Sequence, residues 1–242
     1  MKKKPILFSM LLLSIISCSD DKKKSKEDYN HFLISEITRI SDEKEYKENY
    51  SYKENKILDC DGSKKYYYQA DKITKIELIN SNNEIIKTIE YKYLNNRVDY
   101  YTTVEYGMVF KTKYTYEENG DVLYDTFQLY ESGEEEELDN YGTYTFKNGN
   151  LIKLEEFLDG TETVTEYEYD NQKNPWKNVL GLNLLLDQKP SVNNVVKEKF
   201  NEIDGYSGNT TYSYKYNSDG YPVEKKAIYE DGNVIFLEKF KY

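Results

Sequence analysis

Few residues in this chain have the types and spacing that catalysis needs. His31 is the only histidine, and the two cysteines are Cys18 and Cys60. One histidine excludes Ser-His-Asp and Cys-His arrangements unless His31 itself serves, and it leaves too few nitrogen and sulfur ligands for a zinc site. The sequence also has no glycine-rich phosphate loop. We therefore expect no catalytic residue, no metal, no cofactor and no enzymatic activity.

Acidic residues are the other candidates for chemistry. A glycosidase pair could be present among the 44 Asp and Glu residues, but nothing in the sequence selects two of them. Asp59-Cys60-Asp61-Gly62 matches part of a calcium loop but lacks the distal glutamate, so a plain turn is favoured. The acidic run at 134–137 is typical of a solvated hairpin tip. Weak calcium binding stays open at both places.

The N-terminal segment indicates membrane attachment. Three lysines at positions 2–4 precede an apolar stretch that ends at Ile16, and Ser17-Cys18 follow. The apolar stretch covers only about half of a roughly 30 Å hydrocarbon core. The arrangement resembles the lipobox of bacterial lipoproteins, which implies a signal peptide over residues 1–17 and lipidation of Cys18. Acyl chains would then hold the protein on a membrane that it does not cross.

The residues after the lipobox indicate a cellular location and a flexible tether. Ser19, Asp20 and Asp21 resemble the export signal that sends Bacteroidota lipoproteins to the outer face of the outer membrane, although Lys22-Lys23-Lys24 depart from the uniformly acidic form. A charged segment of this kind buries too little apolar area to fold. We expect residues 18–28 to be a lipidated tether and residues 29–242 to form one domain. The location implied is the outer membrane, at the cell surface.

Charge and cysteine content narrow the possible partners. The formal net charge is −11, with no basic stripe to neutralise phosphates, so we expect no nucleic-acid partner. If Cys18 carries lipid, Cys60 has no partner for a disulfide. A small core residue is favoured for Cys60, and a reactive or intermolecular thiol is the alternative.

Composition favours an all-β fold. The chain has 27 tyrosines, and Ala70 and Ala227 are its only alanines. Tyrosine, threonine and isoleucine suit a pleated, half-buried surface, whereas good helix formers are scarce on apolar faces.

The tyrosines recur in a short unit. Tyr-x-Tyr, a few polar residues and then an aliphatic residue repeat along the chain, for example at Tyr91-Tyr93 with Val98 and Tyr114-Tyr116 with Val122. Glycine turns such as Glu118-Asn119-Gly120 separate the units. This pattern predicts a long antiparallel meander of roughly sixteen strands, a curled sheet or open half-barrel with tyrosines on one face and charged side chains on the other.

One segment interrupts the repeats. Asn174-Pro175-Trp176 precedes the only apolar run outside the signal, and Pro175 suits the first turn of a helix capped by Asn174. We expect a short helix near 175–186 that packs Trp176 and its leucines on the sheet as a core plug. A lid that contacts a ligand is the alternative.

These units resemble the YD-type repeats of Rhs-like proteins, and more closely Bacteroidota lipoproteins of unknown function built from such hairpins. In those proteins an Asn-Pro-aromatic segment interrupts the repeats and a Ser-x-Asn-Asn segment follows, as Asn174-Pro175-Trp176 and Ser191-Val192-Asn193-Asn194 do here. The resemblance extends from about Phe32 to Tyr242. It implies architecture and location, and no reaction.

Most tyrosines are expected to form the core, and an open row of rings that binds sugars or peptides is the sharper alternative. Doubled tyrosines must point rings to both faces. The candidate ligand contacts are therefore Tyr66, Tyr67, Tyr68, Tyr100, Tyr101 and Trp176. The function expected is a lipid-anchored, non-enzymatic binding or adhesion module for glycan or protein, and a periplasmic structural or assembly lipoprotein is the alternative.

Overall fold

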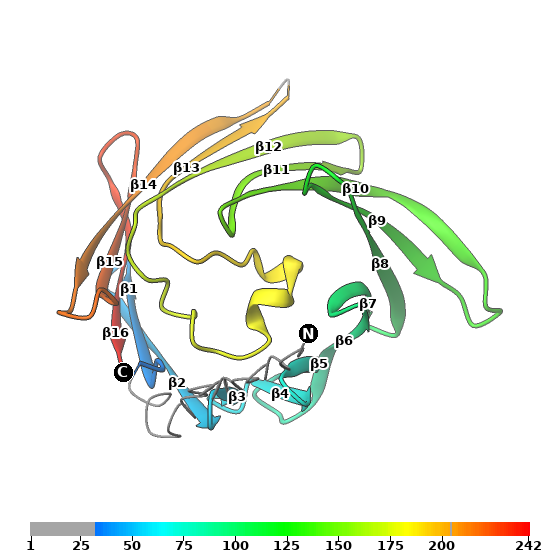
Figure 1. The fold of residues 1–242 in the computed structure, drawn as a ribbon, viewed down its shortest axis with the longest axis horizontal. Helices are drawn as coiled ribbons and strands as arrows, with labels where there is room; N and C mark the ends of the chain where they lie inside the picture. Colours follow the sequence, from blue (N-terminus) through cyan, green and yellow to red (C-terminus); the bar gives the residue numbers. More distant parts are fainter. Residues whose placement is uncertain (1–31, 204) are drawn as a thin grey trace, which may run out of the picture.

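The computed structural model describes residues 32–203 and 205–242, and this part of the chain folds as a closed β-barrel (Figure 1). Every strand pairs antiparallel with its sequence neighbours, and the last strand pairs with the first. The sixteen strands of the described residues are β1 (Glu36–Ser41), β2 (Lys44–Lys53), β3 (Lys56–Cys60), β4 (Lys64–Gln69), β5 (Lys72–Ile79), β6 (Ile85–Leu94), β7 (Arg97–Glu105), β8 (Met108–Tyr116), β9 (Val122–Leu129), β10 (Glu135–Lys147), β11 (Asn150–Leu158), β12 (Thr161–Tyr169), β13 (Val195–Glu202), β14 (Ser207–Tyr216), β15 (Pro222–Tyr229) and β16 (Val234–Lys241).

Closure corrects the predicted open meander. β1 pairs with β16 from Glu36 opposite Lys241 to Ile40 opposite Leu237, so the sheet has no free edge. Unpaired edge strands expose a row of backbone donors and acceptors, and a closed barrel removes that liability. The hairpin pattern in the sequence predicts neighbouring pairs, and it contains no signal for the pairing of two distant ends. The expected curled sheet or half-barrel is therefore wrong, whereas all-β structure and antiparallel hairpins are confirmed.

The predicted helix near 175–186 is also wrong. The segment contains two short 3₁₀ turns, η2 (Leu182–Leu184) and η3 (Leu186–Gln188), within an otherwise irregular path. Gly181, which precedes η2, has a φ of 77°, in the left-handed region that ends a right-handed helix. A Cβ at this position would lie 2.7 Å from the Asp71 carbonyl oxygen, so glycine lets the segment approach the wall closely.

Inward and outward side chains alternate as the sequence predicts. The tyrosine face points into the barrel, where Tyr91, Tyr114, Tyr124 and Tyr144 are buried among branched aliphatic residues. Burial raises the pKa of these phenols, so they stay protonated. Tyr91 donates to Asp187 and Tyr124 to Glu156, whereas the Tyr114 hydroxyl is buried without a partner. The turn expected at Gly120 is present with positive φ, and so are similar turns at Gly149, Gly220 and Gly232.

The second tyrosine of several repeat units bonds to the backbone near a bulge. Its hydroxyl donates to a backbone carbonyl at the start of the preceding strand, at 2.6 to 2.8 Å. These pairs are Tyr93 with Ile73, Tyr116 with Val98, Tyr169 with Leu151, Tyr214 with Val195, and Tyr242 with Pro222. Register shifts lie beside several of these carbonyls; the shift at Lys92/Tyr93, for example, lies opposite Val98, whose carbonyl accepts from Tyr116. The repeat is thus a device that satisfies buried backbone groups.

The outer wall is charged. Ion pairs link neighbouring outward side chains around the barrel, including Lys75–Glu77, Lys111–Glu135, Lys153–Glu155, Lys199–Glu166 and Lys215–Glu224. Tyr67 and Tyr100 also point outward, each beneath a lysine ammonium. Among the described residues, no helix is long and apolar enough to cross a membrane.

Candidate functional site

The connection from β12 to β13 turns into the barrel (Figure 1, yellow). We name residues 170–194 the plug. Its two ends are tied together at the wall, where the Asp170 amide donates to the Asn194 carbonyl at 3.0 Å. The Asp170 carboxylate accepts hydrogen bonds from the backbone amides of Gln172 and Asn194. The plug therefore leaves and rejoins the wall at one narrow neck.

Asparagine side chains replace the helical hydrogen bonds that the plug lacks. Asn150, buried at the start of β11, accepts from the amides of Val192 and Asn193 at 3.0 and 3.1 Å. Asn174 accepts from the Trp176 amide at 2.9 Å and donates to Ser191 Oγ at 3.1 Å. The Asn-Pro-Trp and Ser-x-Asn-Asn segments noted in the sequence therefore contact each other and set the path of the plug.

The opposite wall holds the plug with backbone contacts. The Leu180 amide donates to the Asn55 carbonyl at 2.9 Å, and Asn55 Nδ2 donates to the Asn178 carbonyl at 2.9 Å. Asn178 Nδ2 donates in turn to the Phe32 carbonyl and to Tyr221 Oη. These contacts connect the β2–β3 turn, the β14–β15 turn and the plug at one end of the barrel.

The tip of the plug is apolar with one buried acid. Leu185 and Leu186 join the core cluster formed by β5 to β11. Asp187 beside them accepts from Tyr91 Oη at 2.8 Å, while its Oδ1 is buried with no hydrogen-bond partner. Burial raises the pKa of this carboxyl above its ordinary range, against smaller opposing effects of Gln188 and Tyr91.

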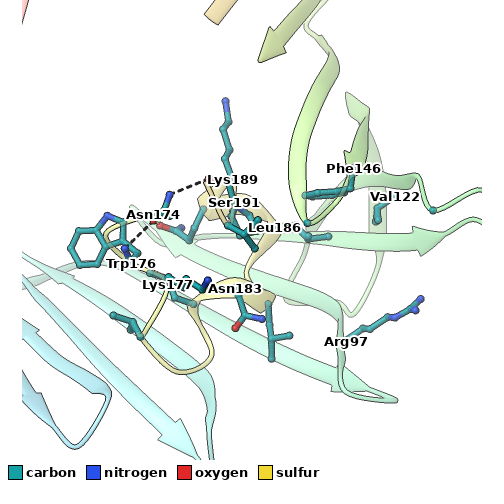
Figure 2. Close-up of a pocket in the computed structure, with 18 of the residues that line it drawn as sticks. Arg97, Val122, Phe146, Asn174, Trp176, Lys177, Asn183, Leu186, Lys189 and Ser191 are labelled. Atoms are coloured by element: carbon teal, nitrogen blue, oxygen red, sulfur yellow. Dashed lines mark hydrogen bonds between the residues drawn. The ribbon is translucent and has the colours of Figure 1, made fainter. Parts of the chain in front are cut away.

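A cavity of about 820 Å³ lies between the plug and the wall of β7 to β11. In Figure 2, Arg97, Val122 and Phe146 belong to the wall. Asn174, Lys177, Asn183, Leu186 and Lys189 belong to the plug. An apolar floor with amide and charged groups around it is the usual composition of a site for a small amphipathic ligand.

The cavity mouth carries charges of both signs. Arg97 lies 4.9 Å from the centre of the Tyr116 ring, and Glu117, Glu118 and Asp121 line the β8–β9 turn on the same side. Lys177 and Asn183 of the plug are exposed. A neutral ligand with many hydroxyl groups can bond to both signs and to the amides.

The tyrosines predicted as ligand contacts do not gather at this cavity. Tyr66 and Tyr68 pack against the core, as does Tyr101, and burial raises the pKa of Tyr66 and Tyr101 to about 12. Tyr67, on the outer wall, donates to Glu77 at 2.6 Å. Trp176 does line the cavity, but its ring packs edge-on against Tyr50 at 5.1 Å.

The remaining predicted positions either have structural roles or lie outside the described residues. Cys60 is a free, buried residue of the inner face. Asp59 and Asp61 accept hydrogen bonds from Gly62 and Asn49 in a plain turn, and no group of three potential metal ligands occurs in the part of the chain that the structure describes. Cys18, Ser19, Asp20, Asp21 and His31 lie outside the described residues.

Sequence reasoning missed Arg97, Phe146 and Asn183. Arg97 and Phe146 occupy repeat positions that look like wall residues, and only the fold of the plug brings Asn183 opposite them. Asn150 was missed as well, because its burial at the start of β11, which requires partners from outside the sheet, is visible only in the folded barrel.

Comparisons with known proteins reveal the fold. No protein-family model matches the chain, and no curated protein matches it. Among solved structures, a porin-like protein from Bacteroides vulgatus aligns with a TM-score of 0.65 at 16% identity, over 87% of this chain and 98% of that one. A porin-like protein from Bacteroides uniformis aligns with a TM-score of 0.54 at 10% identity, over 86% and 97%. The chain thus has the fold of these porin-like Bacteroides proteins, consistent with the resemblance to Bacteroidota sequences.

Proposed function

We propose that this chain is a lipid-anchored, non-enzymatic protein of the outer membrane, exposed at the cell surface, that binds a short glycan in the cavity beside the plug. The observation that carries the proposal is that cavity, about 820 Å³ in volume and lined by Phe146, plug leucines and planar polar side chains. A sugar presents apolar C–H faces and a periphery of hydroxyls. The lining offers apolar contact for the first and amide, carboxylate and guanidinium groups for the second.

The size of the cavity favours a glycan over a protein. Pockets of roughly 300–1,000 Å³ enclose small molecules, whereas a protein surface needs a broad face of about 800 Å² per partner. A short glycan therefore fits this site better than a protein surface does. The tyrosines contribute by shaping the inner face, since most of them are core residues.

The charged outer wall supports attachment by lipid at Cys18 instead of insertion of the barrel. A barrel in a bilayer needs an outward apolar band about 25 Å tall, and a lysine at the midplane costs about 2–4 kcal/mol. Here Lys111, Lys113 and Glu135 form one outward ion-pair cluster, and similar pairs recur on other strands. We infer that the wall stands in water and that the anchor alone meets the membrane.

A glycan array followed by calorimetry tests the binding site. We expect the double variant Lys177→Ala/Asn183→Ala to weaken binding of a glycan hit about tenfold, since both side chains line the cavity and both are exposed. Asn201→Ala/Lys239→Ala, which removes the same side-chain types from β13 and β16, is the matched control. Equal loss in both variants, or cleavage of the bound glycan, contradicts the proposal.

Protease shaving of intact cells tests the location. Loss of the protein while a periplasmic control survives supports surface exposure, and a Cys18→Ala variant is expected to leave the membrane fraction. Full protection from protease favours the periplasmic structural role instead.

A further inference from the structure

The end of the barrel opposite the plug forms a second distinct surface. In an up-and-down barrel, alternate connections lie at the same end. The plug lies with the even-numbered connections, so the eight hairpin turns β1–β2, β3–β4, β5–β6, β7–β8, β9–β10, β11–β12, β13–β14 and β15–β16 form the other end. We name these turns the far rim; they comprise residues 42–43, 61–63, 80–84, 106–107, 130–134, 159–160, 203 with 205–206, and 230–233.

The far rim is acidic. Its described residues include Asp42, Glu84, Glu131, Glu134 and Asp231, and they include no lysine or arginine. At the plug end, Lys173, Lys177 and Lys189 offset the acids of the turns. Uniform charge at one end gives a local negative potential that selects positively charged partners.

The far rim is also apolar. Of the eighteen large hydrophobic side chains that are exposed among the described residues, eleven lie in these turns or within two residues of them, whereas three lie equally close to the connections of the plug end. Tyr106 and Tyr206 are 83% and 64% exposed. Single exposed hydrophobic residues are normal, but such concentration at one end marks an interaction surface.

One part of the far rim has the shape of a docking groove. Ile85, Ile86, Val104 and Tyr106 surround a hollow of about 400 Å³ between the β5–β6 and β7–β8 turns, with Glu84 at its edge. Lys87 also lines the hollow, and its ammonium is paired with Glu105 at 2.9 Å. The next turn contributes Tyr130, whose hydroxyl bonds to Glu136. Apolar side chains framed by carboxylates complement apolar side chains framed by lysine or arginine.

We infer that the far rim, centred on Ile86 and Tyr106, docks a basic amphipathic segment of another protein. The charge argues against the other occupants. Two far rims repel each other, because both are acidic, and an anionic membrane surface repels the same turns. The glycan cavity lies at the opposite end, so this inference stands independently of the proposed function.

A peptide-binding experiment on the full-length protein tests the inference. The first probe is a fluorescent 14-residue amphipathic peptide with leucines on one helical face and lysines on the other. The second is the same peptide with glutamate in place of lysine, and the third is vesicles containing phosphatidylglycerol. We expect the lysine peptide alone to bind, and Ile86→Ser/Tyr106→Ser to weaken its binding at least tenfold. The matched control is Leu94→Ser/Leu123→Ser, which removes two exposed apolar side chains from the plug end and should leave affinity unchanged.

A charge-reversal variant and thermal melting complete the test. Glu84→Lys/Glu131→Lys should weaken the lysine peptide about tenfold as well, and all variants should melt within a few degrees of the parent because their side chains are exposed. Equal loss in the plug-end control overturns the inference, since general attraction to an acidic protein would then explain the binding. Binding of the vesicles, or a dimer in analytical ultracentrifugation that Ile86→Ser/Tyr106→Ser dissolves, overturns it too.

Discussion

The two ends of this barrel are built from the same hairpins but use their side chains differently. At the plug end, asparagine amides and tyrosine hydroxyls satisfy the backbone of a long inward connection and of the strand bulges. At the far rim the turns satisfy their own backbone, as when the Asn80 amide donates to the Glu84 carbonyl at 2.9 Å. Apolar side chains near those turns are consequently left exposed.

This difference sets the expected cost of substitutions. The residues that hold the plug in place have buried partners that a substitution leaves unsatisfied, so changes to them should be costly. Residues at the far rim contact mainly solvent, so changes there should alter binding and little else.

Gly181→Ala should have the largest effect. An alanine at a φ of 77° is strained, and its Cβ would lie 2.7 Å from the Asp71 carbonyl oxygen and 2.9 Å from the Ile73 amide nitrogen. We expect a loss of about 2–5 kcal/mol in unfolding free energy, measured by chemical denaturation. Gly232→Ala, at similar φ with open space around it, is the control for strain alone; equal losses in both would show that the close approach is unimportant.

Asn150→Ala should follow. It removes the acceptor of two plug amides and a donor to Asn193 Oδ1. Buried amides without partners cost about 1–3 kcal/mol, and the plug should become less protected in hydrogen exchange while the strands keep their protection. Unchanged hydrogen exchange in residues 190–194 would contradict the role of Asn150 in holding this part of the plug.

Asp187→Asn should change the pH dependence of stability. The folded protein holds a proton on Asp187 more tightly than the unfolded chain does, because burial raises the pKa of this carboxyl. Its ionisation therefore destabilises the folded state as pH rises from about 4 through the raised pKa. The Tm of the variant, relative to the parent, should increase between pH 4 and pH 8. A constant difference across that range would show that Asp187 is ionised at no cost.

Ile86→Ser/Tyr106→Ser should have the smallest effect on stability, within about 0.5 kcal/mol. Both side chains are exposed, by 42% and 83%. Thermal melting beside Leu94→Ser/Leu123→Ser gives the comparison, and a loss above about 2 kcal/mol would mean that the far rim is part of the core.

Local structure was largely predictable and long-range structure was not. Alternation of Tyr91 and Tyr93 with Glu90 and Lys92 predicts the strand and its two faces, and the glycine turns predict the hairpins. Closure depends on the pairing of β1 with β16, for which the intervening sequence carries no local signal. The helix prediction, based on Pro175 in a first turn capped by Asn174 and on the apolar run that follows, failed because Gly181 and the asparagine contacts impose an irregular path.

The candidate site was predictable only in outline. The interrupted repeat at Asn174-Pro175-Trp176 correctly indicated a segment that packs on the sheet. The doubled tyrosines did not indicate contacts at the cavity, since Tyr66 and Tyr101 are inward core residues and Tyr67 belongs to the outer wall. Cavity residues such as Asn183 reach the cavity through the path of the plug in space, which cannot be deduced from the spacing of residues in the sequence.

The junction of β1 and β16 also has a consequence for biogenesis. Ser35 Oγ donates to the Lys241 carbonyl across 206 positions of sequence, so the last strand must be available before the first can be paired on that side. Hairpins can form one by one as the chain emerges, but the ring cannot be sealed until β16 is available to pair with β1. A chain that lacks β16 would present the open edges of β1 and β15 together, and such unpaired edges are templates for aggregation.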